Sequence, residues 1–343
     1  MIGESKPTVL VTGGAGYIGA HTAKALGERG FRPVVFDNLT SGYREAVRWG
    51  ELVQGDIRDE AALGRAFTEH GVQAVIHFAG LIEVGRSTQR PDLFWDINVA
   101  GTRSLLTAMQ THGVGRLVFS SSAAVYGQAG RGPLETIPEE APKTPSSPYG
   151  DTKLACEWMI AAQCRAYGLT GVALRYFNAA GADPSGLIGE AHEPETHLIP
   201  LAMAAGLGDG KPLTVFGDDF DTPDGTCLRD YIHVNDLASA HVAALEVDLP
   251  AGAFEAVNIG TGAGHSVRDV VGAVGRALGR PVPHSTGPRR DGDPPSLVAN
   301  ASRARSLLGW EPLCSSLDEI VRDALRWEGQ PRYGAGSRGA RKT

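Results

Sequence analysis

A strand that runs directly into a glycine-rich turn and a helix is the strongest constraint on the fold of this 343-residue chain. The apolar run Val9–Thr12 continues into Gly13–Gly19 (GGAGYIG), and an alanine-rich helical stretch follows. Gly13 permits a tight turn, Gly16 lets the backbone approach a pyrophosphate at the helix N-terminus, and Gly19 allows close helix packing. The segment therefore predicts a dinucleotide site at the first strand–helix junction of an α/β sheet.

An acidic residue follows the next expected strand. Arg32–Phe36 runs into Asp37, which lies 18 residues beyond Gly19 (37 − 19), close to the roughly 20 expected of the acid that binds an adenosine ribose. A carboxylate there repels a 2′-phosphate, so NAD is favoured over NADP. The alternative is that Asp37 is a turn residue before Asn38. Asp56-Ile57, after a third strand, could contact the adenine ring or lie on a surface loop.

Short apolar runs alternate with helix-like stretches as far as Tyr176, which is typical of βαβ units on a buried parallel sheet. We expect an α/β fold with a doubly wound parallel sheet in residues 1–178, a smaller C-terminal substrate-binding lobe in 179–330, and a disordered tail in 331–343. Val257–Thr261 is expected to return to the first domain. Ligands of such sheets bind at the carboxyl ends of the strands. The expected strands are Thr8–Thr12, Arg32–Phe36, Glu51–Gln54, Ala74–His77, Arg116–Ser121 and Leu169–Tyr176.

Composition excludes several classes of function. A net charge of -7 and a pI near 5.8 remove the usual electrostatic basis for binding nucleic acid. No apolar run reaches the roughly 20 residues of a membrane span, and no secretory signal is visible at the N-terminus, so we expect a cytoplasmic protein. The cysteines are widely spaced, which indicates reduced thiols and neither a disulfide framework nor a metal site; they are Cys156, Cys164, Cys227 and Cys314.

A tyrosine and a lysine occur with helical spacing just after a strand that ends in serines. A helix is expected after Pro148, and Tyr149 and Lys153 are at i and i+4, on one face of it. A cation ~4 Å from the phenolate, at an effective dielectric of ~20, is worth about 4 kcal/mol, or roughly three pKa units. That would bring the phenol toward neutrality, where it is useful as a base. Ser122 could hold an alcohol or carbonyl oxygen. The alternative is a solvent-facing helix beside a serine turn.

The ordered motifs of the chain resemble those of the extended short-chain dehydrogenase/reductase superfamily and, within it, the UDP-glucose 4-epimerases. The similarity covers about Val9 to Glu328. Its motifs in the first domain are Thr12–Gly19, Asp37–Leu39, His77–Gly80, Ser120–Gly127, Tyr149–Lys153 and Arg175–Asn178. The most specific ones lie in the second lobe: Glu195–Pro200, Val215–Asp219, Asp221–His233 and Arg289–Asp293. The resemblance implies a Rossmann fold with bound NAD, a UDP-sugar substrate, and a homodimer formed through Pro91–Thr111 and Pro148–Tyr167.

The resemblance also implies roles for single residues. Tyr149 would be the base, Lys153 would bind the nicotinamide ribose, and Ser122 would contact the sugar hydroxyl. The expected cofactor contacts are Gly13, Gly16, Tyr17, Ile18, Gly19, Asp37, Asn38, Asp56, Ile57, Phe78, Ala79, Gly80, Asn98, Ser120, Tyr149, Lys153, Tyr176 and Phe177. The expected nucleotide-sugar contacts are Ser122, Tyr149, Asn178, His197, Leu198, Phe216, Arg229, Arg290, Asp293 and Leu297.

The two arginines fit a diphosphate on physical grounds, because guanidinium groups are planar and always charged. Arg229 could instead form an ion pair with Asp230 or Asp236. Two positions depart from the family pattern. Ile82 stands where a lysine is often found, and Leu297, at the position that controls acceptance of C2 substituents, is neither a tyrosine nor a small residue. The sequence therefore leaves acceptance of N-acetylated sugars open.

The expected function is NAD-dependent epimerisation at C4 of UDP-galactose and UDP-glucose through a transient 4-keto sugar. Epimerisation of UDP-pentoses (UDP-xylose and UDP-arabinose) or of UDP-N-acetylhexosamines is the alternative within the same chemistry. A non-catalytic NAD-binding sensor is the alternative from another class. A 4,6-dehydratase is disfavoured, because Ala123-Ala124 follow Ser122 where elimination of water would require an acid and a base.

Overall fold

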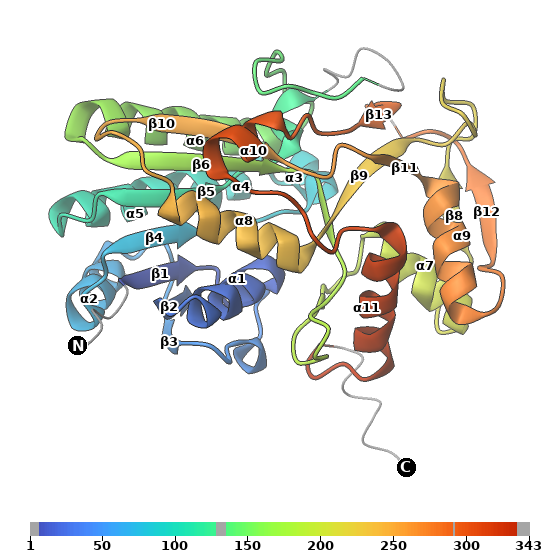
Figure 1. Cartoon of the computed structure of the whole chain (residues 1–343), viewed down its shortest axis with the longest axis horizontal. Helices are drawn as coiled ribbons and strands as arrows, with labels where there is room; N and C mark the ends of the chain where they lie inside the picture. Colours follow the sequence, from blue (N-terminus) through green and yellow to red (C-terminus); the bar gives the residue numbers. More distant parts are fainter. Residues whose placement is uncertain (1–6, 128–134, 291, 335–343) are drawn as a thin grey trace.

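The computed structural model describes residues 7–127, 135–290 and 292–334. A seven-stranded sheet forms its centre, with the order β10-β6-β5-β4-β1-β2-β3 and all neighbouring strands parallel (Figure 1). The predicted fold class is confirmed, and the ends of the six strands expected before residue 177 differ from the observed ones by at most one residue. The returning strand expected at Val257–Thr261 is β10, which begins three residues earlier and ends two residues earlier. The strands are β1 (Thr8–Thr12), β2 (Arg32–Asp37), β3 (Glu51–Gln54), β4 (Ala74–His77), β5 (Arg116–Ser120), β6 (Thr170–Tyr176) and β10 (Phe254–Ile259).

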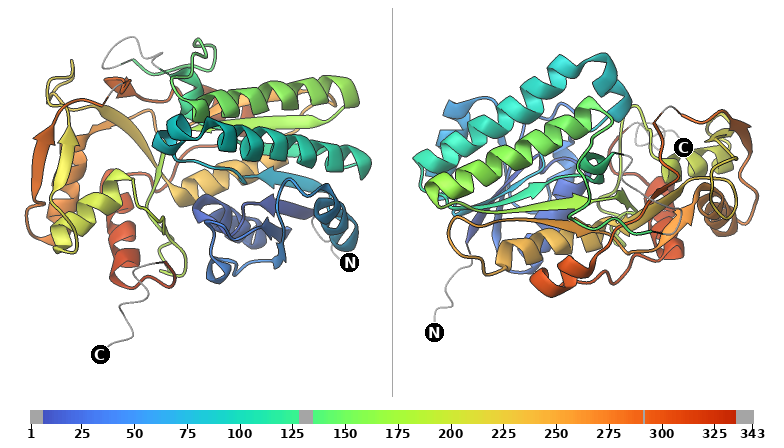
Figure 2. Two further views of the ribbon diagram at one scale, coloured as in Figure 1. Left: turned by 180° about the vertical axis from the view of Figure 1, so that it is seen from behind. Right: turned by 90° about the horizontal axis from the view of Figure 1, so that it is seen from above.

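Helices cover both faces of this sheet, which is why its central strands are uninterrupted apolar runs. On one face lie α1 (Tyr17–Glu28), α8 (Val234–Glu246) and α10 (Ser302–Leu308), and on the other lie α2 (Glu60–His70), α5 (Gly101–Thr111) and α6 (Pro148–Tyr167) (Figure 2). Shorter elements complete the domain: α3 (Val84–Gln89), α4 (Pro91–Phe94), a π-helix (Trp95–Ala100) and two 3-10 helices (Arg44–Ala46 and Ala123–Tyr126).

Local sequence signals set the ends of α6. The Ser147 hydroxyl accepts a hydrogen bond from the Gly150 amide, Pro148 occupies the first helical position, and Gly168 ends the helix with a φ of 73°. A side-chain cap at the start and a left-handed glycine at the end satisfy backbone groups that a helix leaves unpaired. Tyr149 is therefore fixed in the first turn of α6.

A smaller lobe lies beyond the carboxyl ends of the large sheet (Figure 1). In it β9 (Leu228–His233) pairs with β7 (Asn178–Ala180), β11 (Gly264–Ser266) and β13 (Ser296–Leu297), and β8 (Leu213–Phe216) pairs with β12 (His284–Gly287). Three helices pack around a separate apolar cluster: α7 (Leu198–Leu207), α9 (Val267–Leu278) and α11 (Leu317–Gly329). Between these elements the chain returns to the large sheet as β10.

The packed part of the chain extends to Tyr333, beyond the expected start of the disordered tail at residue 331. Tyr333 lies within the segment expected to be disordered, yet it is buried, stacks on Tyr43 with ring centroids 5.1 Å apart, and contacts Trp327. Its hydroxyl donates a hydrogen bond to the Gly189 carbonyl. The expectation was therefore wrong for Tyr333, because one aromatic ring can bury enough apolar surface to order its neighbours. Residues 335–343 lie outside the described part of the chain.

None of the described helices has the length and apolar character needed to cross a bilayer. The four cysteines, all within the described residues, are free thiols.

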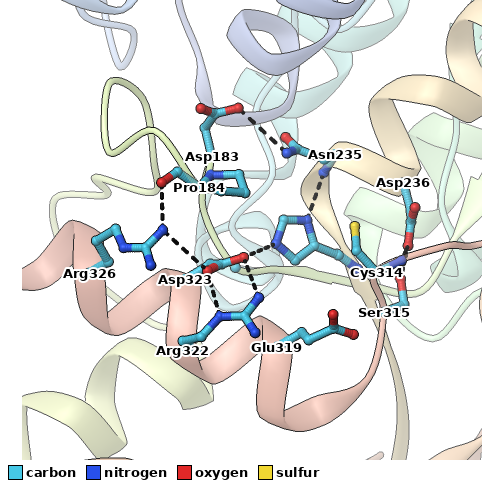
Figure 3. Close-up of polar contacts among 12 residues, drawn as sticks. Asp183, Pro184, Asn235, Asp236, Cys314, Ser315, Glu319, Arg322, Asp323 and Arg326 are labelled. Carbon is cyan, nitrogen blue, oxygen red and sulfur yellow. Dashed lines mark hydrogen bonds and ion pairs between the residues drawn. The ribbon is translucent and has the colours of Figure 1, made fainter.

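Two buried carboxylates fasten the C-terminal segment to α8 and β9 (Figure 3). Asp236 accepts hydrogen bonds from the backbone amides of Leu313 and Cys314, each at 2.9 Å, and from the Ser315 hydroxyl at 2.5 Å. Asp323 of α11 lies 3.5 Å from Nε2 of His233. Because hydrogen bonds to a charged acceptor are the stronger kind, Asp236 should contribute much of the energy that holds α11 in place.

Substituting Asp236 tests this attachment. Asp236→Ala leaves the Leu313 and Cys314 amides and the Ser315 hydroxyl without their charged acceptor. We therefore expect the free energy of unfolding to fall by roughly 3 kcal/mol. Urea unfolding followed by circular dichroism measures the change. Asp209→Ala, which removes an exposed carboxylate just after α7, is the control and should be nearly neutral. A loss no larger than that of the control would show that Asp236 does not anchor α11.

Candidate active site

The three expected catalytic side chains meet where β5 ends. Tyr149 and Lys153 lie in the first two turns of α6 and are both buried. The Lys153 ammonium donates a hydrogen bond to the Ser120 carbonyl at 2.9 Å. Ser122 directly precedes the 3-10 helix after β5, and its hydroxyl accepts a hydrogen bond from the Ala124 amide. The same hydroxyl acts on the Tyr149 phenol and lowers its pKa, against the larger effect of burial. The arrangement places a phenol, a hydroxyl and an ammonium within one small region.

Burial alters the acid–base properties of this group in a direction that the sequence analysis did not anticipate. Burial raises the pKa of Tyr149 well above its usual value, and it lowers the pKa of Lys153 to about 8. The Lys153 nitrogen is 5.8 Å from the centroid of the Tyr149 ring. The expectation that Lys153 alone brings the phenol toward neutrality is therefore wrong, because desolvation outweighs the charge.

Gly13 and Gly19 of the glycine turn pack closely against other backbone atoms, whereas Gly16 has open space beside it. A Cβ atom at Gly13 would lie 2.6 Å from the Ala79 amide nitrogen, and one at Gly19 would lie 2.3 Å from the Gly13 oxygen. At Gly16, among the described residues, a Cβ would meet only the Gly13 oxygen within 4 Å. The described residues also provide no side-chain cap for α1. The first amides of α1 can therefore face a phosphate, as the glycine spacing predicts.

Asp37 is joined to this turn. Its carboxylate accepts hydrogen bonds from the Ala15 amide at 3.0 Å and the Leu39 amide at 2.8 Å, and burial raises its pKa. Carboxylate oxygens can accept further hydrogen bonds, so Asp37 can support the glycine turn and still bind a ribose diol. Asp37 thus ends β2 beside the glycine turn, and its hydrogen bond from the Leu39 amide also supports the turn that follows.

In the loops after β2 and β3, Asn38 and Asp56 already have protein partners. Asn38 donates a hydrogen bond to Asp56 at 3.2 Å, and the guanidinium of Arg58 holds the pKa of Asp56 well below its usual range. Ile57 is buried in the core, where it packs closely against Gly101. In this structure the Asp56 carboxylate faces Arg58, as expected of a residue on a surface loop.

Asn98 and Ser120 have protein partners in this structure. Asn98 is buried, its side chain exchanges hydrogen bonds with the backbone of Leu81, and it donates one to Thr152. Ser120 shares a hydrogen bond of 2.8 Å with the Tyr176 hydroxyl. These residues shape the loop after β4 and the ends of β5 and β6. Ile82, the departure from the family pattern, is exposed.

Tyr17 and Phe78 connect the dinucleotide turn to other elements. The Tyr17 hydroxyl donates a hydrogen bond to the Gly181 carbonyl at 2.6 Å, so the start of α1 is tied to the segment after β7. Phe78 packs against His241 of α8 with ring centroids 4.6 Å apart. Ile18 lies at the edge of the core between α1 and α8, and Ala79 and Gly80 continue the loop after β4.

The expected nucleotide-sugar residues form two pairs in the smaller lobe. Arg229 pairs with Asp293 at 3.1 Å, so the alternative of an ion pair with Asp230 or Asp236 is wrong. The Arg290 guanidinium lies over the ring of Phe216, 4.1 Å from its centroid. Each pair brings together residues that are far apart in sequence and were expected at the same site.

The other expected substrate residues lie on the elements between the two lobes. Asn178 begins β7 and donates a hydrogen bond to the Asp230 carbonyl at 2.9 Å. Leu297 is opposite Arg229 in the β13–β9 register and packs with Phe177 against the 3-10 helix that follows Ser122. His197 directly precedes α7, which begins at Leu198. The residue expected to control C2 substituents is thus packed beside the catalytic group.

A buried ion pair behind the catalytic residues was missed by the sequence analysis. Glu157 of α6 accepts two hydrogen bonds from Arg175 of β6, at 2.9 and 2.6 Å, and one from the Ser121 hydroxyl at 2.6 Å. The sequence contained one indication that Glu157 faces inward, because it follows Lys153 by four positions (157 − 153). It therefore lies on the same inward face of α6 as Lys153.

The parallel sheet, the glycine turn and the tyrosine–lysine pair define the class of dinucleotide-binding α/β proteins. The family model described as "NAD dependent epimerase/dehydratase family" matches residues 9–260, and the chain belongs to this family. A UDP-glucose 4-epimerase of Rhizobium leguminosarum bv. trifolii is 50% identical over 327 residues, which cover 95% of this chain and 98% of the relative.

Solved structures show the same similarity. The crystal structure of UDP-glucose 4-epimerase from Brucella ovis in complex with NAD is 49% identical, with a TM-score of 0.89, and covers 94% of this chain and 98% of that one. The enzyme from Bifidobacterium longum in complex with NAD+ and UDP is 39% identical, with a TM-score of 0.89 and the same shares covered.

The buried Lys153 makes stability of the unliganded protein depend on pH. Its pKa of about 8 lies below the ordinary 10.5, so between these values the unfolded chain binds more protons than the folded one. Stability therefore rises with pH across this window, by an amount on the order of 3 kcal/mol.

Comparison with Lys153→Met isolates this contribution. We expect the free energy of unfolding of the wild type, relative to the variant, to increase as the pH is raised from about 7 to about 11. Urea titrations at each pH provide the measurement, and Lys211→Met, which removes an exposed lysine, is the control. If the difference between wild type and Lys153→Met does not change with pH, the assigned pKa of Lys153 is wrong.

Proposed function

We propose that this chain catalyses the NAD-dependent inversion of C4 of a UDP-sugar, interconverting UDP-galactose and UDP-glucose through a transient 4-keto sugar. The observation that carries the proposal is the meeting of Ser122, Tyr149 and Lys153 at the end of β5. Membership of the epimerase/dehydratase family, and relatives named UDP-glucose 4-epimerase along nearly their whole length, support it.

The chemistry follows from the positions of these groups. Tyr149 accepts the proton of the C4 hydroxyl while Ser122 holds the same oxygen by a hydrogen bond. Bound NAD would supply the hydride acceptor for C4 and a fixed positive charge close to the phenol. That charge adds to the charge of Lys153 and opposes the desolvation that raises the pKa of Tyr149. Tyr149 then returns the proton to the oxygen on the inverted carbon.

Inversion requires the keto sugar to present its other face while the nucleotide stays in place. Arg229 and Arg290 are suited to hold a diphosphate, because each guanidinium offers several donors in a plane and stays charged. Their guanidinium groups are already positioned by Asp293 and Phe216. Arg229 and Arg290, which would hold the diphosphate, therefore lie on different elements from Tyr149 and Ser122. The keto sugar can rotate while its nucleotide stays bound.

We assign NAD binding to residues 1–178 together with the later segments that return to the large sheet. Residues 179–330 would bind the nucleotide sugar. We place the enzyme in the cytoplasm, where sugar nucleotides and NAD are available. UDP-pentoses and UDP-N-acetylhexosamines are alternative substrates of the same site, and Leu297 is the residue at which N-acetylated sugars would be accepted or rejected.

Tyr149→Phe tests the chemical role of the phenol. We expect kcat for conversion of UDP-galactose to UDP-glucose, without added oxidant, to fall at least 10²-fold, the usual loss when a general base is removed. Chromatography of the sugar nucleotides measures it. Tyr167→Phe, at the exposed end of α6, is the control, and NAD retained by both variants would show an intact fold.

Two other outcomes distinguish the alternatives. Unchanged turnover in Tyr149→Phe would remove the phenol from the mechanism. A wild type that binds NAD but converts no UDP-galactose would direct the assay to UDP-pentoses and UDP-N-acetylhexosamines. Failure with every UDP-sugar would leave a non-catalytic NAD-binding sensor.

We also propose a homodimer formed through α5 and α6. Large apolar side chains are exposed along this side of the molecule: Trp158 and Tyr167 of α6 are 66% and 60% exposed, and Trp95 before α5 is 45% exposed. Exposed aromatic residues are enriched at interaction surfaces. The two helices lie next to each other on one face of the sheet (Figure 2), so two copies can pack as a four-helix layer.

Trp158→Glu tests the dimer. A charge in the centre of the interface should convert the dimer to a monomer at micromolar concentration, because an unpaired buried charge is strongly unfavourable. Light scattering coupled to size-exclusion chromatography measures the molar mass. Leu313→Glu, an exposed position near the start of α8, is the control and should remain dimeric. A monomeric wild type would contradict the proposal.

A further inference from the structure

Four side chains with metal-binding donor atoms converge in the segment between β7 and α7. They are Glu190, His192, Glu195 and His197, and the atoms that each offers lie within 4.8 Å of one another. The Glu190 side chain is only 6% exposed, whereas those of His192 and His197 are 20% and 45% exposed. The cluster thus has a buried carboxylate at its base and remains accessible to an ion from solvent.

The donor atoms of the four side chains lie close to one another. Nδ1 of His192 is 3.1 Å from Oε1 of Glu190 and 3.8 Å from Oε1 of Glu195. Nδ1 of His197 is in direct contact with the same Glu190 oxygen. The two imidazole rings meet edge to face with centroids 5.0 Å apart. Two nitrogen atoms and two carboxylates therefore surround one small volume.

These separations suit a tetrahedral ion. With metal–ligand distances of roughly 2.0 Å, neighbouring ligand atoms of a tetrahedral zinc site are about 3.3 Å apart. The distances from His192 to the two glutamates lie on either side of that value, and His197 and Glu190 would separate slightly to reach it. Imidazole nitrogens together with carboxylates favour zinc among the abundant divalent cations, because magnesium and calcium prefer all-oxygen sites.

We propose that Glu190, His192, Glu195 and His197 form a zinc-binding site. The site goes beyond the proposed epimerase activity, because metal binding there requires no turnover. It shares one residue, His197, with the expected nucleotide-sugar contacts. His192 contacts Tyr17 edge to face, with ring centroids 6.2 Å apart, and His197 directly precedes α7. A bound ion would therefore fasten the segment that links the start of α1 to the smaller lobe.

Direct measurement of metal content tests the site. The 343-residue chain, as purified with its cofactor, is treated with EDTA, dialysed, and equilibrated with zinc chloride at pH 7.5. Bound zinc is then measured by mass spectrometry. We expect one zinc ion per chain, and an affinity at least tenfold lower in His192→Gln. His284→Gln, an exposed histidine in β12, is the control and should bind like the wild type.

Two further readouts keep the test independent of catalysis and of folding defects. Glu195→Gln removes a partly exposed ligand without altering the buried Glu190, and it should also weaken zinc binding. Cobalt in place of zinc should give the intense visible absorption of a four-coordinate ion in the wild type and lose it in His192→Gln. Zinc should raise Tm of the wild type by several degrees and have no such effect on His192→Gln.

The competing explanation is a cluster of ion pairs in which protonated imidazoles bridge the glutamates. In that case no zinc is retained after dialysis, or the amount retained is the same in His192→Gln, Glu195→Gln and His284→Gln. Either result overturns the zinc site. Neither result bears on the epimerase activity, which the UDP-galactose assay tests separately.

Discussion

The buried ion pair between Arg175 of β6 and Glu157 of α6 is the interaction on which the geometry of the catalytic group depends. Both side chains are almost fully excluded from solvent and share two hydrogen bonds. A single charge left in such a place would cost several kcal/mol, so neither partner can leave the other. Because Glu157 lies on the same helix as Tyr149 and Lys153, the pair fixes how α6 is rotated against the end of β5.

The same network reaches segments that are distant in sequence. Arg175 also donates hydrogen bonds to the Tyr126 hydroxyl and the Glu139 carbonyl, and Tyr126 donates one to Asn258 of β10. The 3-10 helix that follows Ser122, the loop before α6 and the returning strand are therefore held by one set of charges. This rigidity lets the site present its phenol and hydroxyl in a fixed arrangement before a ligand binds.

The smaller lobe completes the site through strand register and packing. Leu297 faces Arg229 across β13 and β9 and packs with Phe177 beside the catalytic 3-10 helix. Burial by these surroundings opposes ionisation of Tyr149. The proposed mechanism therefore requires the protein to exclude water around a phenol whose charge is balanced by Lys153 and by the cofactor together.

The sequence by itself determined the strands of the large sheet, the glycine turn, Asp37 at the end of β2, and the spacing of Tyr149 and Lys153. These features depend on local backbone preferences and on the periodicity of apolar residues, which a short window of sequence contains. Only the tertiary structure decided that Arg229 pairs with Asp293, 64 residues away, and that Glu157 binds Arg175. It also reversed the expected effect on the pKa of Tyr149 and placed Tyr333 in the core. The partners of charged groups and the depth of burial depend on which distant segments meet, and no local pattern encodes that.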